Sequence, residues 1–289
     1  MYGPDMPSVR LLGPADLPAV DAFLLRHADS SLFLRSNLRT AGIVDRGETF
    51  QGTYAGAFDG GDLVGVAAHC WNGNVIVQAP AALDAVVRTA VAATGRGVRG
   101  IVGPWEQSMA ARGALAMADR PARFESRDVL FALALADLVR PATLDAPDVR
   151  GRAAHAGDLD LLTRWNTAYN VELLGATDGE ALRAEARANV QRMCDRDSAW
   201  LLERAGAPVA FSGFNARLPD VVQIGAVFTP PAFRSNGWAR AAVASQLAAV
   251  RGEGVGRAIL FTGAEHHAAQ RAYHAIGFHP IGDYGLLLF

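Results

Sequence analysis

Arg234 and Gly237 stand in a segment whose residue types could bind an anionic group. The residues after this segment repeat apolar side chains at helical spacing. The first amides of a helix have no partner inside it and carry the positive end of the helix dipole, and glycine lets a phosphate approach them. The sequence therefore predicts a phosphate site formed by Arg234, Ser235, Asn236, Gly237, Trp238 and Ala239.

The elements around this segment must position it. Residues 221–229 are predicted to form a buried strand, which two prolines end because proline cannot donate to a sheet ladder. A helix follows and ends near Gly252. Residues 257–262 then predict a strand, residues 269–276 a further helix, and residues 284–289 a last strand.

This order of elements resembles the GNAT acyl-CoA N-acyltransferases. Their pyrophosphate-binding signature is Gln or Arg, two variable residues, Gly, one variable residue, and Gly or Ala, which residues 234–239 match. The resemblance covers about residues 149–289 and is most specific over residues 227–278. It implies acetyl-CoA as co-substrate, bound in an opening between the fourth and fifth strands.

The resemblance also implies roles for individual residues. The backbone of Val227, Phe228 and Thr229 would border the pantetheine chain, with one amide polarising the thioester carbonyl, an effect worth about 3 kcal/mol. Tyr273 falls where the family has its general acid, and a phenol with a pKa of about 10 can protonate a leaving thiolate. The alternative for Tyr273 is simple packing on a helix face. His266 takes the place of a common cofactor-binding Asn and can also form hydrogen bonds.

Glu172 is the candidate general base. It follows Trp165 and Tyr169 at intervals of about one helical turn, so the three side chains share a face of the predicted helix. The resemblance implies that this helix borders the acceptor site. The alternative is a solvated carboxylate on the protein surface.

The composition excludes several classes of function. All 27 Lys+Arg residues are Arg, which rules out enzymes that need a particular lysine, such as Schiff-base enzymes and protein kinases. A net charge of −2 without a basic cluster argues against a nucleic-acid partner. The sequence lacks the G-x-S-x-G motif of enzymes that form a covalent intermediate on serine. Direct transfer in a ternary complex is therefore expected.

The same reasoning bears on metals, membranes and compartment. The seven histidines lack H-E-x-x-H spacing, so no metal site is predicted. No run of eighteen apolar residues predicts a membrane span, and the first ten residues do not resemble a signal peptide. Cys70 and Cys194 are too few for a disulfide framework, which favours a reduced, cytoplasmic protein.

The first half of the chain repeats the order of the second half. A three-stranded meander over residues 51–79 precedes a helix, a strand, a helix and a strand. Its turn at residues 79–84 has neither Gly nor a basic residue, which predicts a degenerate GNAT-like domain over residues 1–140. A proline-containing linker at residues 137–147 then leads to a catalytic domain over residues 147–289.

Together these patterns predict an α/β protein with mixed, α+β-type sheets in two tandem GNAT-like domains. It would transfer an acetyl group from acetyl-CoA to a primary amine of a small molecule, as a monomer or homodimer. One alternative is an acyl-CoA-binding or regulatory module without turnover. Another is a tandem acyltransferase like mycothiol synthase, whose acceptor is an elaborated amino sugar.

Overall fold

The computed structural model describes residues 7–289, which form two compact units. The first unit comprises the chain up to Val129 together with Gly282–Phe289, and the second is Leu130–Ile281. The chain thus passes from one unit to the other twice. The predicted degenerate domain over residues 1–140 and catalytic domain over residues 147–289 stay a prediction.

The first unit contains a mixed sheet in the order β1-β2-β3-β4-β5-β12. The strands from β1 to β4 form an antiparallel meander, β4 and β5 are parallel, and β12 runs antiparallel to β5 with Tyr284 opposite Pro104. The strands are β1 (Ser8–Leu11), β2 (Gly52–Asp59), β3 (Asp62–Cys70), β4 (Asn74–Gln78), β5 (Gly100–Pro104) and β12 (His279–Leu288).

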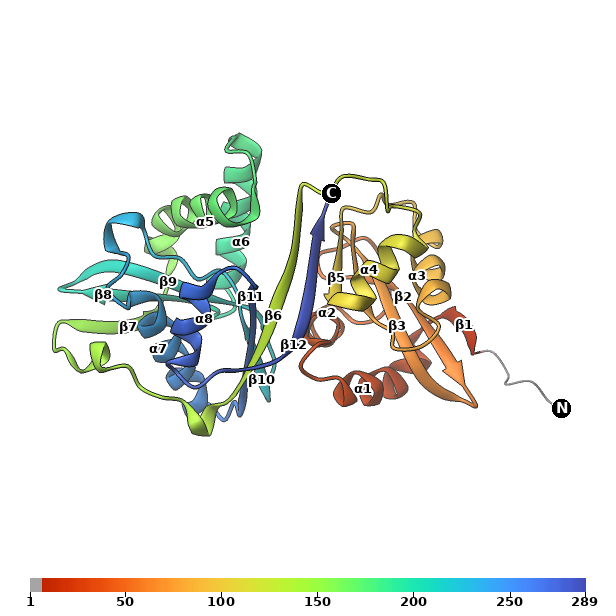
Figure 1. Ribbon diagram of the computed structural model, residues 1–289, viewed down its shortest axis with the longest axis horizontal. Helices are drawn as coiled ribbons and strands as arrows, with labels where there is room; N and C mark the ends of the chain where they lie inside the picture. The colour runs from red at the N-terminus through yellow and green to blue at the C-terminus, as the bar shows by residue number, and fades with distance from the viewer. Residues whose placement is uncertain (1–6) are drawn as a thin grey trace. The chain divides into compact units, whose positions relative to one another are not determined.

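Two helix pairs cover the two faces of this sheet (Figure 1). Side chains alternate between the faces of a strand, so Tyr54 packs with α1 and α2 whereas its neighbour Ala55 packs with α3 and α4. The helices are α1 (Leu17–Arg26), α2 (Leu32–Ala41), α3 (Leu83–Ala92) and α4 (Trp105–Ala114).

The second unit repeats this plan with the strand order β6-β11-β10-β9-β8-β7. Its strands are β6 (Phe124–Ala134), which begins in the first unit, β7 (Val149–Ala153), β8 (Ala199–Arg204), β9 (Ala207–Arg217), β10 (Val221–Ile224) and β11 (Arg257–Gly263). The helices are α5 (Leu159–Leu174), α6 (Glu180–Cys194), α7 (Trp238–Gly252) and α8 (His267–His274). The mixed α/β class expected from the sequence is confirmed.

Helix α7 forms where its apolar spacing predicts it. Ala241, Val243 and Leu247 are buried, and α7 packs along β7, β8 and β9. The other face of that sheet carries α5 and α6, whose Leu162 and Val190 share a core with Phe211 (Figure 1). Helices therefore cover both faces of this sheet.

Several elements differ from the sequence prediction: β1 and α2 were not predicted, and β12 begins at His279 instead of Tyr284. Strand β10 ends at Ile224 instead of Thr229, and its pairing with β9 shifts register between Gln223 and Ile224. Residues 137–147, predicted as a linker, pack within the second unit, where the Val139 amide donates to the Ile276 carbonyl at 3.2 Å. The last two differences arise from contacts distant in sequence.

Candidate functional site

Strands β10 and β11 part in the middle of the second unit. They pair in parallel from Val221 opposite Arg257 to Gln223 opposite Ile259, and no further. Beyond the register shift the chain stays bonded to β9 alone, because the Gly225 amide donates to Gly213 at 2.7 Å and Phe228 exchanges two 2.9 Å hydrogen bonds with Phe211.

The backbone amides on the other edge of this segment stay unpaired. Within residues 7–289, the Val227 and Thr229 amides donate to no acceptor, whereas that of Phe228, between them, does. Alternate amides of an extended chain point to opposite sides. The amides of Val227 and Thr229 therefore point to the side where β11 no longer pairs with this segment. A cofactor that adds to the sheet as a further strand would need such free amides.

The predicted phosphate segment forms the turn into α7. Ser235 and Gly237 have φ angles of 65° and 76°, in the left-handed region that glycine adopts without strain. The first helical hydrogen bond runs from the Ala241 amide to the Gly237 carbonyl at 3.1 Å. The amides that precede it at the helix start are thus oriented outward, which is the arrangement that binds an anion.

Side chains of the turn hold its shape. The Asn236 amide group donates to the carbonyls of Phe233 at 3.2 Å and Arg234 at 2.9 Å. Trp238 is buried, and the Arg204 guanidinium lies 5.6 Å from its ring centre. We infer that these side chains position the backbone.

Arg234 connects this turn to helix α5. Its Nε donates to the Thr229 carbonyl at 2.9 Å, and its Nη2 donates to the Glu172 carboxylate at 2.7 Å. Its guanidinium also lies 5.8 Å from the ring centre of Phe228, and that ring lies 6.4 Å from the ring of Trp165. The structure therefore brings the predicted base, Glu172, against the first residue of the phosphate motif.

Tyr273 lies on α8 and is half-buried. Its ring packs 6.5 Å from Phe131 and 6.0 Å from Phe278. Burial, with a smaller contribution from the nearby Tyr169 phenol, raises the pKa of Tyr273 above its usual value. Within residues 7–289 no hydrogen bond involves its hydroxyl, and the raised pKa keeps the phenol neutral; its predicted role as general acid stays a prediction.

His266 occupies the residue before α8 and is exposed. Its ring lies over Gly263, where an added Cβ would approach Nδ1 to 3.2 Å, and its carbonyl accepts from the Gln270 amide at 3.1 Å. Its predicted contact with the cofactor stays a prediction.

We call the predicted phosphate-binding turn at residues 234–239 the phosphate cradle. The first unit differs from the second at the corresponding turn. Helix α3 follows Ala82, which has a φ of 51°, and the Ala79 amide just after β4 donates to the Gln107 side chain at 2.6 Å. The Gln107 side chain thus already accepts the hydrogen bond that the Ala79 amide, at the end of β4, could otherwise donate to a ligand. This contact agrees with the prediction that the first half lacks a working phosphate cradle, which stays a prediction.

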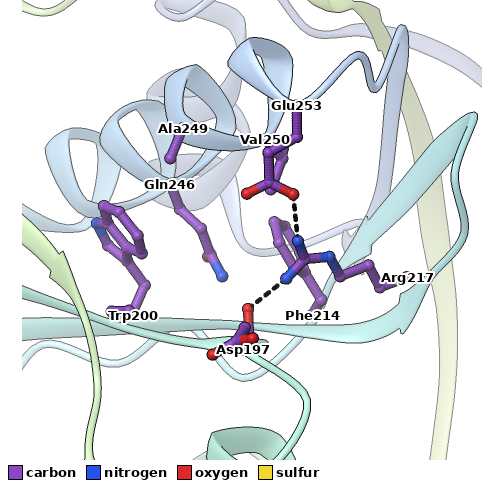
Figure 2. A pocket seen from close by; sticks show the side chains of 9 residues that line it. Asp197, Trp200, Phe214, Arg217, Gln246, Ala249, Val250 and Glu253 are labelled. Carbon is purple, nitrogen blue, oxygen red and sulfur yellow. Dashed lines mark hydrogen bonds and ion pairs between the residues drawn. The ribbon is translucent and has the colours of Figure 1, made fainter.

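A cavity of 360 Å³ in the second unit lies apart from the predicted site residues. It has an aromatic side formed by Trp200 and Phe214, and a polar side where Arg217 pairs with Glu253 and donates to the Asp197 carbonyl (Figure 2). No motif in the sequence indicated it. Trp200, Gln246, Arg217 and Glu253 already have hydrogen-bond partners, so the cavity carries no functional assignment.

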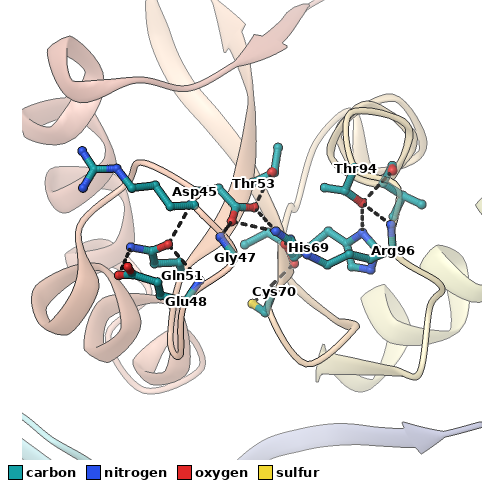
Figure 3. Close-up of polar contacts among 12 residues, drawn as sticks. Asp45, Gly47, Glu48, Gln51, Thr53, His69, Cys70, Thr94 and Arg96 are labelled. Carbon is teal, nitrogen blue, oxygen red and sulfur yellow. Dashed lines mark hydrogen bonds and ion pairs between the residues drawn. The ribbon is translucent and has the colours of Figure 1, made fainter.

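A partly buried polar cluster in the first unit was not predicted from the sequence either. Arg96 donates to both carboxylate oxygens of Asp45 at 2.7 Å and to the His69 carbonyl at 3.0 Å (Figure 3). The His69 ring is fully buried, with its Nδ1 2.6 Å from the Thr94 hydroxyl. The cluster joins two loops to the end of β3.

The described part of the chain shows neither a metal cluster nor a membrane helix. Residues 7–289 contain no group of three or more His, Cys, Asp or Glu side chains arranged to hold a metal ion. Among the described helices, none is long and apolar enough to cross a membrane.

Residues 162–278 match the family model described as the acetyltransferase (GNAT) family. No curated protein sequence matches the chain. The matched segment contains α5, the strand opening, the turn into α7 and Tyr273.

Solved structures resemble the chain over nearly its full length. A Drosophila protein has a TM-score of 0.67 at 13% identity, with 97% of this chain and 98% of that chain covered. A GCN5-related N-acetyltransferase from Sphaerobacter thermophilus has a TM-score of 0.59 at 18% identity, covering 99% and 96%. A tandem GNAT protein from the clavulanic acid biosynthesis pathway has a TM-score of 0.57 at 12% identity, covering 97% of both chains. At these identities the likeness establishes the fold.

Proposed function

We propose, on the premise that residues 162–278 belong to the GNAT acetyltransferase family, that this protein transfers an acetyl group from acetyl-CoA to a primary amine of a small molecule. The observation that carries the proposal is the parting of β10 and β11, which leaves the Val227 and Thr229 amides unpaired. Transfer would be direct, within a ternary complex of enzyme, acetyl-CoA and amine.

The residues present fit acetyl-CoA. The outward amides around Gly237 suit its pyrophosphate, because they combine free donors with the positive end of the α7 dipole. The unpaired amides of Val227 and Thr229 suit the pantetheine chain, which can pair with the segment as an added strand would. When bound, acetyl-CoA would supply the activated acetyl group.

The chain's residues would then act at three atoms. The Val227 amide would donate to the thioester oxygen and stabilise the negative charge that develops there, by about 3 kcal/mol. The amine nitrogen forms a bond to the acetyl carbon as the carbon–sulfur bond breaks. The Tyr273 phenol, which stays protonated at neutral pH, would give its proton to the leaving thiolate.

Glu172 remains our candidate for the base that takes the proton of the amine. Its carboxylate pairs with Arg234, so it would accept a proton only as that ion pair exchanges or through water. Glu172→Gln should then lower turnover at saturation and leave the affinity for acetyl-CoA nearly unchanged. Loss of affinity with normal turnover would instead mean that Glu172 serves only to hold Arg234.

The experiment that tests the proposal is release of free thiol from acetyl-CoA by the full chain with a panel of primary amines, including amino sugars, and mass spectrometry of the acetylated product. Turnover of one amine well above the rate without protein supports the proposal. Binding of acetyl-CoA without turnover of any amine would favour the regulatory module. Turnover restricted to elaborated amino sugars would favour the mycothiol-synthase-like alternative.

The compartment and the oligomeric state of the protein are also proposed. Cys70 and Cys194 are both free in the structure, which suits a reducing compartment, and we propose a cytoplasmic protein that acts as a monomer or homodimer.

A further inference from the structure

Gln223 stands at the closed end of the opening between β10 and β11. It forms the last parallel pair of the two strands, opposite Ile259, and the residue is only 2% exposed. Its side-chain Nε2 is buried and has no hydrogen-bond partner within residues 7–289. Buried polar groups of native proteins nearly always have a partner, so one that lacks it calls for an explanation, among them an absent ligand.

The position of Gln223 relates it to the reacting end of the proposed carrier. The phosphate cradle follows Thr229 in the chain, so a carrier bound at the cradle and along the Thr229 and Val227 amides points its acyl end back toward Gln223. Gln223 precedes Val227 by four residues, at most about 13 Å of extended chain. An acetyl group held at the Val227 amide is too short to fill that length. The remaining space is therefore left for the acceptor.

The chain beside Gln223 is polar and open to solvent. Gly225 lies between Gln223 and Val227, and a Cβ added to it would lie 2.5 Å from Nδ2 of Asn215. The Asn215 carboxamide therefore packs on the Gly225 backbone, and Asn215 is exposed. Two carboxamides, one buried and one exposed, thus lie where the two strands part. A polar group of a substrate could reach this place from solvent.

We propose that Gln223 binds a hydroxyl group of the acceptor and makes the enzyme selective for amines that carry one. The inference rests on the proposed acetyl transfer. A glutamine side chain offers two N–H donors and an acceptor oxygen, and a hydroxyl can accept from the one and donate to the other. The bound hydroxyl would satisfy the buried Nε2. An amine without the hydroxyl would leave that donor unmet, which is how a polar site rejects an apolar analogue.

The experiment compares amines built on one ring as acceptors for acetyl-CoA with the full chain: cyclohexylamine, trans-2-aminocyclohexanol and trans-4-aminocyclohexanol. The wild type should have a kcat/KM for at least one amino alcohol that is about tenfold or more above its kcat/KM for cyclohexylamine.

Gln223→Met separates the hydroxyl contact from the shape of the site. Methionine keeps the length of the side chain and removes the donor. The variant should lose most of the preference for the amino alcohol and turn over cyclohexylamine within about twofold of the wild type. Comparing the two proteins on the same pair of amines cancels the intrinsic reactivity of each amine.

The matched control is Gln78→Met. Gln78 is a buried glutamine on β4 of the first unit, and its Oε1 accepts from the Ser30 hydroxyl at 2.7 Å. The control makes the same chemical change in the unit that lacks the strand opening. It should keep the wild-type preference among the amines.

Melting temperatures without ligand separate a binding role from a structural one. Gln223→Met removes an unmet donor, so the ligand-free variant should melt at the wild-type temperature or above it. Three results would overturn the proposal and leave acetyl transfer intact: no hydroxyl preference in the wild type, an unchanged preference in Gln223→Met, or a lower melting temperature with equal loss for all the amines. Absence of turnover with every amine would overturn both.

Discussion

Tyr273 occupies a position where ring packing and proton donation can be tested separately. Its ring contacts Phe131 and Phe278, whereas its hydroxyl bonds no residue of the described chain. Phenylalanine would keep the ring and remove only the proton. The residue therefore offers a cleaner test of mechanism than Glu172, whose carboxylate also holds Arg234.

Tyr273→Phe should lower turnover by about 10²-fold or more and leave the affinity for CoA nearly unchanged, because it removes a proton donor used as the thiolate leaves. The measurement is turnover at saturating acetyl-CoA with an amine from the screen, together with titration by CoA. Tyr284→Phe, a buried tyrosine of the first unit, is the control and should be neutral. Near wild-type turnover in Tyr273→Phe would remove it as the general acid.

Gly237→Asp should abolish the stabilisation of the protein by acetyl-CoA. The new carboxylate would lie against the outward amides and within reach of Arg240, and so would oppose an incoming phosphate. For the wild type, ligand at 100 times its dissociation constant should add about 2.7 kcal/mol of stability. Thermal melting with and without acetyl-CoA measures the difference.

The control for this substitution is Gly254→Asp. Gly254 has a φ of 98° beyond the end of α7, and no atom lies within 4 Å of an added Cβ. It therefore imposes similar backbone strain without touching the cradle. A folded Gly237→Asp protein that acetyl-CoA still stabilises would show that the cofactor binds elsewhere.

At the scale of elements, sequence periodicity located most helices and strands but could not identify their partners. Helix α7 was predictable because its apolar spacing and terminal glycines are local signals. The early end of β10 was not, since it depends on a register shift against β9. The predicted phosphate motif was local too, whereas the unpaired Gln223 side chain and the Gln107 contact with Ala79 emerge only when side chains are placed in space.

His69, on β3, should make the free energy of unfolding depend on pH. Burial, and then the nearby Arg96 cation, lower the pKa of His69, and these effects outweigh the carbonyls of Gly73 and Gly97 and the Asp45 carboxylate, which favour the charged ring. The folded protein therefore keeps His69 neutral where the unfolded chain, with a pKa of about 6.5, takes up a proton.

Stability should accordingly fall as pH drops below about 6.5, with a slope from His69 of at most about 1.4 kcal/mol per pH unit. Urea unfolding between pH 7.5 and 5.5 measures it, and His69→Gln should flatten the dependence. His27→Gln is the comparison, because burial lowers the pKa of this half-buried histidine too. An unchanged slope in His69→Gln would show that His69 is not the titrating group.

At the scale of the whole molecule, the two units share a plan but differ at the turn before the helices α3 and α7. The second has an αL glycine before α7 and free strand amides, whereas the first has Ala82 before α3 and an amide bonded to Gln107. The full chain should therefore bind one equivalent of CoA. Calorimetry gives the stoichiometry, and Gly237→Asp should remove all binding; two equivalents, or one that survives in this variant, would contradict a degenerate first half.

The last strand has a consequence for how the protein is made. Gly282–Phe289 belong to the first unit, where Leu287 is fully buried and Tyr284 pairs with Pro104, 180 positions earlier in the chain. Translation delivers these residues after the whole of the second unit, so the part of the first unit made before it must wait, with one side of β5 unpaired, until the second unit has been synthesised. An exposed strand edge invites association with other chains, and the first unit would carry one while the second unit is being synthesised.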